Sequence, residues 1–208
     1  MSVDILAPIR VAPIAVTTSV KRPGKRTALL EATGTVGDRP VLCVRAWRFP
    51  RIGGDYPATP EIASDLRGET DRAEDGGVIP VAHVDGYLSA TQFRFTTGSF
   101  AEFGPAEAWG RSLCTRLPGE ELTPWQRVPD SRGLVERREY GRGPRRYPAI
   151  NSDLHVVVHR DPVGDWIGIR SETHSARGHG AAAYARLADV SGIVGACAQS
   201  LYASTAGR

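Results

Sequence analysis

The stretch NSDLHVVVHRDP, Asn151 to Pro162, is the first key to the fold. Its two histidines could bind one metal ion if the stretch is a helix but not if it is a strand, so its secondary structure must be settled first. On a helix, His155 and His159 lie on adjacent turns, where one zinc ion can contact both. On a strand they share a face but stand about 13 Å apart at roughly 3.3 Å per residue, too far for one metal ion. The three valines between them favour a strand, and Pro162 ends the run. We therefore predict a strand with two imidazoles on one face, and no metal site.

The composition is that of an ordinary globular protein. The chain has 208 residues, of which 41% are hydrophobic and 24% are charged, enough for one domain or two small ones. No apolar run approaches the roughly 20 residues that cross a bilayer. The first residues, MSVDILAPIR, lack the apolar core and cleavage site of a signal peptide. We expect a cytoplasmic protein without a membrane span.

The three cysteines, Cys43, Cys114 and Cys197, are far apart in the sequence and show no paired spacing. This argues against a disulfide framework and against a zinc ribbon. Cys43 and Cys197 lie in alternating apolar runs and are predicted to be buried strand residues. A nucleophilic cysteine stays open as an alternative, although no partner histidine can be assigned to it.

A weak internal repeat organises the chain. DILAPIRVAP (residues 4–13) and DLHVVVHRDP (153–162) each start with aspartate and close with arginine and proline. In both copies a second alternating segment, a strand, a turn and a final strand follow. The turns are expected at Gly37-Asp38 and Ser191-Gly192, residue pairs that suit hairpins. Each copy is expected to contribute about four antiparallel strands.

The repeat predicts three parts in the chain. Residues 1–49 form a partial first unit that has strands and no helix. Residues 50–84 are rich in proline, glycine and acidic side chains and are expected to be a linker or surface loop. Residues 85–205 form a second, more complete unit with two further strand-like segments. Its helix is expected to start at Thr123-Pro124, since threonine is a good N-cap and proline a good first helical residue.

An arginine-rich stretch, SRGLVERREYGRGPRRYP, spans residues 131–148. It is either a solvated loop face or a patch that binds anions through bidentate guanidinium contacts. It contains no recognisable nucleic-acid-binding motif, and we expect no nucleic-acid partner.

Two similar units with antiparallel strands and room for one helix suggest an α+β hotdog fold, an antiparallel curved sheet around a central helix. INSDLHVVVHRDPVGDWIGIRSETHS and ADVSGIVGACAQSLY resemble the C-terminal half of the acyl-CoA thioesterase II-like double-hotdog family. The matching motifs are N-x-D-L, H-R-x-P-x-G-x-W and A-Q-S-L. The segments FRFTTGSFAEFGPAEAWGR and PWQRVPDSRG are similar to the preceding strands and helix of that family. The resemblance covers residues 85–204, and more loosely 3–49, as a truncated double hotdog.

The resemblance implies an acyl-CoA hydrolase in which a polar trio orients and activates water. By motif the trio falls on Asp130, Asn151 and Gln199. A carboxylate can serve as general base, and two neutral amides can position the water. Because a thiolate leaves readily, we expect neither a metal nor another cofactor. From the residues alone, Asp130 can equally be a helix-end aspartate, Asn151 a turn residue, and Gln199 a buried glutamine bonded to backbone.

An acyl-CoA substrate would give the arginine-rich stretch a purpose, because coenzyme A carries phosphates. The candidates for these contacts are Arg132, Arg145 and Arg146. Trp125, Trp166 and the valine-rich faces are either walls of an acyl tunnel or plain core.

Two features depart from the family pattern. Pro129 directly precedes Asp130, so Val128 is expected to be extended and the helix to end there. The first unit is incomplete, and a second copy of the chain is a candidate to complete it. These departures motivate two alternatives to the enzyme: a non-catalytic acyl-CoA or lipid-binding hotdog module, and a degenerate remnant.

Overall fold

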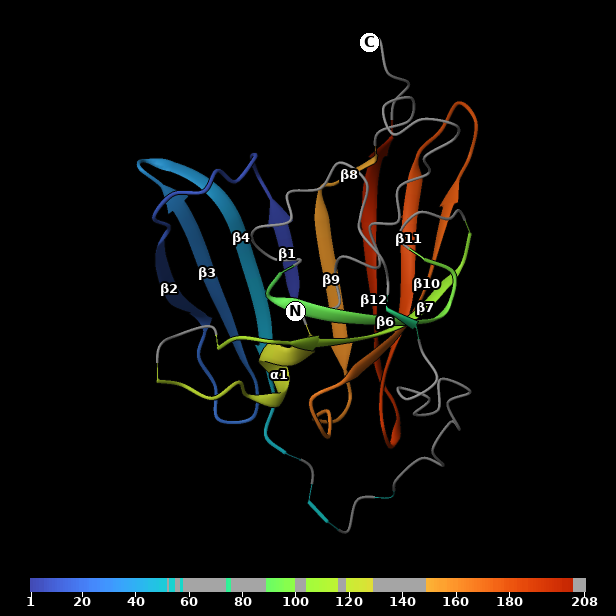
Figure 1. The fold of residues 1–208 in the computed structure, drawn as a ribbon. Helices are drawn as coiled ribbons and strands as arrows, with labels where there is room; N and C mark the ends of the chain where they lie inside the picture. Colours follow the sequence, from blue (N-terminus) through green and yellow to red (C-terminus); the bar gives the residue numbers. More distant parts are fainter. Residues whose placement is uncertain are drawn as a thin grey trace.

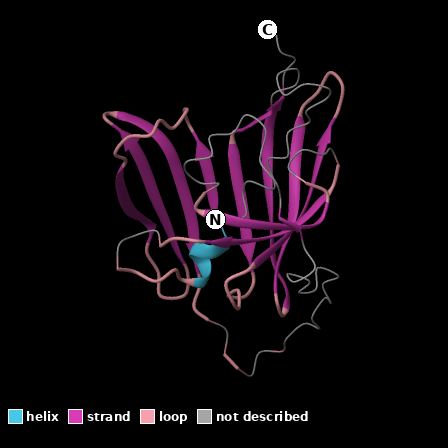
Figure 2. Cartoon of the chain, viewed as in Figure 1, coloured by secondary structure: helices cyan, strands magenta, loops and turns pink. Residues whose placement is uncertain are grey.

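The computed structural model describes residues 1–51, 53–54, 57, 74–75, 89–99, 104–115, 119–128 and 149–203. These residues form strands almost throughout, with one short helix (Figures 1 and 2). The first strands are β1 Ser2–Ile5, β2 Ala15–Arg22, β3 Ala28–Val36, β4 Arg39–Arg48, β5 Glu74–Asp75, β6 Thr91–Thr97 and β7 Ala106–Ser112. They are followed by α1 Pro124–Arg127, β8 Ala149–Asn151, β9 Asp153–Val158, β10 Ile167–Ser175, β11 Ala181–Asp189 and β12 Gly192–Ala203.

The strand predicted from the two histidines is confirmed. It consists of β8 and β9, which are separated only by Ser152. Leu154 and Val156 are buried, whereas His155 and Val157 are exposed, the alternation of a half-buried strand. His159 lies beyond the end of β9, and both histidines are exposed, so the prediction of a strand face lined by two imidazoles is wrong.

The strands form one antiparallel sheet in the order β2-β3-β4-β1-β9-β12-β11-β10-β7-β6-β5, and β8 pairs with β12 beside this path. The two copies of the repeat meet at its centre, where β1 pairs with β9. From this junction the order β1, β4, β3, β2 runs outward on one side and β9, β12, β11, β10 on the other. The sheet therefore arranges both copies with the same internal topology.

The two predicted hairpin turns have different outcomes. The β3–β4 turn lies at Gly37-Asp38 as predicted, and Gly37 has a φ of 58°, the left-handed conformation that such turns need. The β11–β12 turn lies one residue earlier than predicted, at Val190-Ser191, and Gly192 already belongs to β12. The Asp189 carboxylate accepts hydrogen bonds from the backbone N–H groups of Ser191 and Gly192, which sets the turn at this position.

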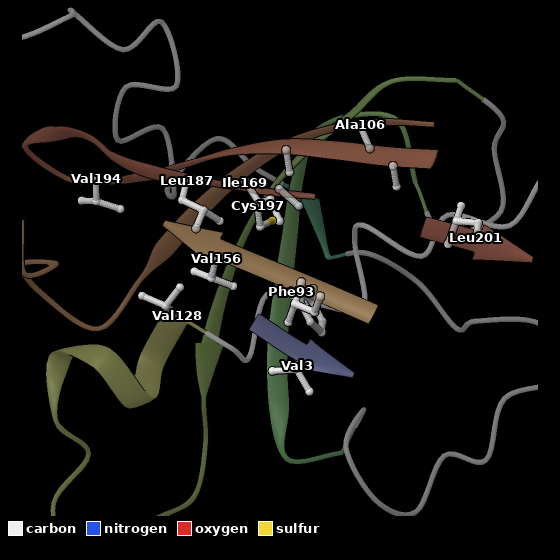
Figure 3. Close-up of a cluster of buried hydrophobic side chains, with 14 of the residues drawn as sticks. Val3, Phe93, Ala106, Val128, Val156, Ile169, Leu187, Val194, Cys197 and Leu201 are labelled. Atoms are coloured by element: carbon white, nitrogen blue, oxygen red, sulfur yellow. The ribbon is translucent and has the colours of Figure 1, made fainter. Parts of the chain in front are cut away.

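The main core covers one face of the sheet. Strand β6 crosses in front of β1, β9 and β12 in Figure 1, and its Phe93 and Phe95 pack in the same buried cluster as Val3 and Leu154. The shared face of β9 to β12 supplies most other members of this cluster: Val156, Ile169, Ala183, Ala185, Leu187, Val194, Cys197 and Leu201 (Figure 3). A sheet folded over its own apolar face thus forms the core.

Helix α1 starts where the sequence predicts. The Thr123 hydroxyl accepts a hydrogen bond from the Gln126 N–H, and the Gln126 side chain accepts one from the Thr123 N–H at 2.8 Å, a reciprocal capping box. The prediction that Val128 is extended is wrong, since its φ of −60° and ψ of −44° are helical. Its side chain is 3% exposed within the core, and burying a valine contributes about 1.5–3 kcal/mol, enough to offset the steric bias before proline.

The described part of α1 is a single turn, so the expected central helix stays a prediction. No helix in the described ranges is long and apolar enough to cross a membrane. The predicted linker, residues 50–84, falls mostly outside the described residues.

The sheet face of the first copy is apolar but open. Leu42 and Val44 on β4 pack against the core cluster. Farther from the centre, Val16 and Val20 on β2 are 64% and 57% exposed. The outer strands of this copy therefore present uncovered apolar side chains.

Candidate active site

Gln199 is a buried polar residue on the core face of β12. Its side chain is 2% exposed, and it alternates with Cys197 and Leu201, which are also buried. Neither Nε2 nor Oε1 of Gln199 has a hydrogen-bond partner within the described part of the chain. A buried polar group without a partner costs about 1–3 kcal/mol, so such a group in a folded protein calls for an explanation, of which a role in binding or catalysis is one.

Asn151 ends β8 and lies directly opposite Leu201 of β12. Directly opposed residues of an antiparallel pair point to the same face, so Asn151 shares the face of Gln199. Gln199 lies two residues before Leu201 on β12, so the two amide residues are near neighbours across the strand pair.

The third member of the predicted trio, Asp130, lies outside the described residues, as do Arg132, Arg145 and Arg146. Val128 is the last described residue before Asp130, and it packs in the core cluster beside Val156 (Figure 3). The chain thus reaches the core face two residues before Asp130. The structure places Asn151 opposite Leu201, two residues from Gln199 along β12, and it describes no position for the other four residues.

The surroundings of Gln199 are apolar and dry. Burial raises the pKa of the Cys197 thiol to about 12, so this cysteine is neutral at physiological pH. A neutral thiol is a poor nucleophile, which argues against the alternative of a catalytic Cys197. Cys43 is only half-buried, Cys114 is exposed, and all three thiols are free.

The H-R-x-P-x-G-x-W motif has a structural role that the sequence did not reveal. Arg160 donates hydrogen bonds from Nη1 and Nη2 to the two carboxylate oxygens of Asp189, at 2.5 and 2.7 Å. The Val163 N–H also donates to Asp189, at 2.7 Å. These contacts lock the loop after β9 onto the β11–β12 hairpin. Arginine is suited to this place because its planar fork matches a carboxylate.

Trp166, the last residue of that motif, packs on the other side of the sheet. It contacts a small buried cluster of Trp109 and Ala188, and the guanidinium groups of Arg94 and Arg111 lie 5.2 and 4.9 Å from its ring centroid. These are cation–π distances. The other tryptophan considered for an acyl tunnel, Trp125, is 45% exposed at the start of α1.

A groove of about 580 Å³ lies on the face of the sheet opposite the main core. Its walls include His155, Val157, Tyr184 and Arg186, which alternate with the buried residues of their strands and so face away from the core. Asn151 and Gln199 do not line it.

The geometry defines the class of fold to which the protein belongs. It is a long antiparallel sheet that folds over one apolar face, and two amide side chains lie on that face. Solved structures share this fold. They include a conserved protein of unknown function with a hot dog fold from Alicyclobacillus acidocaldarius, with TM-score 0.72, 15% identity, and coverage of 98% of this chain and 77% of that chain. The acyl-CoA thioesterase II TesB2 from Mycobacterium marinum aligns with TM-score 0.65 and 12% identity, over 99% of this chain and 80% of that one. The tesB protein of Mycobacterium avium subspecies paratuberculosis aligns with TM-score 0.64 and 14% identity, over 98% and 77%.

The family model of the acyl-CoA thioesterase C-terminal domain matches residues 60–203. This range is more than half of the sequence, and the chain belongs to that family. No curated protein matches the chain in sequence. The resemblance drawn from the N-x-D-L, H-R-x-P-x-G-x-W and A-Q-S-L motifs is thereby confirmed.

Proposed function

We propose that this protein hydrolyses acyl-CoA thioesters, with Asp130 as general base toward water and with Asn151 and Gln199 holding that water. The observation that carries the proposal is the buried amide of Gln199, which lacks a described partner and shares a face with Asn151. Membership of the acyl-CoA thioesterase family supplies the substrate class.

The residue types suit each part of the reaction. The Asp130 carboxylate takes a proton from water as the water oxygen forms a bond to the thioester carbonyl carbon. The tetrahedral intermediate then collapses, the carbon–sulfur bond breaks, and the sulfur of coenzyme A takes up the proton. The amides of Asn151 and Gln199 orient the water without competing for that proton, so positioning contributes much of the rate. The products are a carboxylic acid and free coenzyme A.

Substrate contacts follow from the same proposal. Arg132, Arg145 and Arg146 bind the phosphates of coenzyme A, as bidentate guanidinium groups do well. The acyl chain lies along the apolar face next to Gln199. Replacing Arg145 and Arg146 by alanine should raise KM with little change in kcat, because phosphate contacts are made equally in the ground state and the transition state.

Release of free thiol from acyl-CoA substrates of several chain lengths tests the activity. The wild type should turn over at least one chain length, and Asp130→Asn should lower kcat by about 10²- to 10⁴-fold. Asp38→Asn, in the exposed β3–β4 turn, is the matched control and should keep wild-type turnover. Full activity of Asp130→Asn contradicts its role as base. Tight acyl-CoA binding in calorimetry without thiol release favours the non-catalytic module instead.

We also propose that two copies of the chain pair edge to edge through β2. In the described sheet, β2 is the terminal strand, whereas its counterpart β10 in the other copy of the repeat is paired with β7. Exposed edge strands readily pair with other strands. Antiparallel pairing of β2 with itself places the basic Lys21 and Arg22 beside the uncharged start of the partner strand, so like charges stay apart.

Sedimentation velocity tests this pairing. The wild type should sediment as a dimer, and Val20→Lys should sediment as a monomer because a lysine on the apolar face of an edge strand blocks association. Ser19→Lys adds the same charge on the opposite face of β2 and serves as control. A monomeric wild type, or a dimeric Val20→Lys, overturns the proposal.

A further inference from the structure

A β-bulge separates Asn151 from the rest of its strand. Asn151 pairs with Leu201, and His155 pairs with Ala198. Between these two pairs β12 has two residues, Gln199 and Ser200, whereas the other strand has three, Ser152 to Leu154. One residue is therefore extra on the β8–β9 side, which is the definition of a bulge.

The bulge changes the face on which Asn151 lies. In an unbroken strand Asn151 and His155 would share a face, because side chains alternate with a period of two. His155 faces outward, with its side chain 58% exposed. Asn151 instead lies opposite the buried Leu201, and its neighbour Ile150 points outward, 58% exposed. The bulge thus turns Asn151 onto the face that carries Gln199.

Asp153 stabilises this bulge through hydrogen bonds to the partner strand. Its Oδ1 accepts a hydrogen bond from the Ser200 backbone N–H at 2.6 Å, and its Oδ2 accepts one from the Ser200 hydroxyl at 2.8 Å. The Ser152 N–H donates to the Ser200 carbonyl at 3.1 Å. Ser200 sits between Gln199 and Leu201, the residue opposite Asn151. The Asp153 carboxylate therefore accepts the hydrogen bond from the Ser200 N–H, which in a regular antiparallel pair a backbone carbonyl of the neighbouring strand would accept.

We propose that Asp153 is a positioning residue for the hydrolytic site: through Ser200 it sets the register that places Asn151 beside Gln199. The inference rests on the proposed function for its catalytic consequence. Asp153 lies next to the outward-facing His155, with Oδ2 3.9 Å from its Nε2, and directly opposite Asp4 of β1. It acts through the strand rather than by touching substrate on the core face.

Kinetics of three variants separate positioning from simple stabilisation. Asp153→Ala removes both acceptors and should lower kcat by about 10- to 100-fold with KM within about twofold, because small misplacements of orienting groups cost this much. Asp153→Asn keeps an oxygen for the Ser200 N–H and should restore kcat to within about threefold of wild type. Glu172→Ala, which removes another outward-facing carboxylate beside a histidine, is the control and should not change kcat.

Side-chain amide NMR gives a readout that does not depend on turnover. The NH₂ resonances of Asn151 and Gln199, assigned from Asn151→Asp and Gln199→Glu, should both shift in Asp153→Ala and return in Asp153→Asn. Unchanged kcat or unchanged resonances in a folded Asp153→Ala overturn the positioning role. If the wild type has no thioesterase activity, the proposed function is overturned but the role of Asp153 is not. In that case the shift of the Asn151 and Gln199 NH₂ resonances in Asp153→Ala still tests whether Asp153 sets this register.

Discussion

Asp4 of β1 lies directly opposite Asp153 of β9, at the junction where the two copies of the repeat pair with each other. The two aspartates are the matching first residues of the two copies, so the sheet brings equivalent positions face to face. Asp153 is occupied by its hydrogen bonds to Ser200, whereas Asp4 is exposed on the neighbouring strand. The repeat thus creates a like-charge pair at its own junction.

Removing the charge of Asp4 should stabilise the protein slightly. Like charges directly opposite each other on adjacent strands are unfavourable, and such cross-strand pairs contribute roughly 0.2–1 kcal/mol. Asp4→Asn should therefore raise the free energy of unfolding by an amount in that range, measured by urea denaturation at low salt. Added salt should reduce the difference, since it screens exposed charges. A destabilised Asp4→Asn would mean that the carboxylate has a favourable contact.

Breaking the Arg160–Asp189 pair should destabilise the fold strongly. The Asp189 side chain is fully buried, and removing one partner of a buried ion pair costs about 3–5 kcal/mol because a charge is left without compensation. Arg160→Ala should show this loss in chemical denaturation. Arg51→Ala, which breaks the exposed pair between Arg51 and Asp161, is the matched control and should cost only about 0–1 kcal/mol. Equal losses in both variants would contradict the structural role of the motif.

The same pair should make stability depend on pH in a defined direction. Burial acts to raise the pKa of the Asp189 carboxyl, but hydrogen bonds from Arg160 and from the N–H groups of Val163 and Ser191 outweigh it, so the pKa lies below its ordinary value. A carboxyl with a lowered pKa in the folded state contributes stability above its unfolded pKa, about 3.9, and loses it as pH falls through the folded value. The difference in Tm between wild type and Arg160→Ala should therefore be largest near pH 7 and shrink below about pH 4. A constant difference would exclude this linkage.

Replacing Gln199 should separate stability from activity. Gln199→Met removes the unsatisfied buried amide and nearly conserves volume, so the free energy of unfolding should stay equal or rise by about 1–3 kcal/mol. Turnover should nevertheless fall about 100-fold, because the water loses one of its holders. Cys197→Ala, on the same face two residues away, is the control and should keep turnover within a few fold. A destabilised but active Gln199→Met would assign the residue to the fold instead of the site.

The thiols should differ sharply in reactivity. Cys114 is exposed, whereas Cys197 is buried and its pKa is raised to about 12. Thiolates attack aromatic disulfide reagents and release the aromatic thiol, so Cys114 should react fast and Cys197 only on unfolding. Cys114→Ser should remove most of the fast phase measured without substrate. Rapid labelling of Cys197 in the folded protein would show that its side of the core opens.

Local features could be predicted from the sequence because they depend on neighbours along the chain. Alternating apolar residues predicted the strands, and the β-branched run between His155 and His159 excluded a helix. Helix α1 begins at Pro124 with Thr123 as its N-cap, as predicted, whereas the reciprocal contact with Gln126 was not predicted. The prediction that Val128 is extended was wrong. Burial of its side chain in the core outweighed the steric preference for an extended residue before proline.

The candidate site could be predicted only in part. Asn151 and Gln199 were predicted from motifs that resemble the acyl-CoA thioesterase II-like family. The residues around each of them in the sequence do not indicate that the two side chains share a face of the sheet. The ion pair between Asp189 and Arg160 was not predicted. An aspartate just before a hairpin turn is usually explained by the turn itself, so the sequence provides no reason to expect a distant partner. Asp130 and the three arginines remain predictions.

The sequence by itself determined which segments are strands, where α1 begins, and that the chain repeats; each of these is encoded in residues a few positions apart. Only the tertiary structure decided that Asn151 turns toward Gln199. Strict alternation would place Asn151 on the outer face with His155. The bulge that reverses this forms against β12, through hydrogen bonds between residues 47 positions apart. The face of a side chain beyond a bulge depends on the partner strand, and no local pattern contains that information.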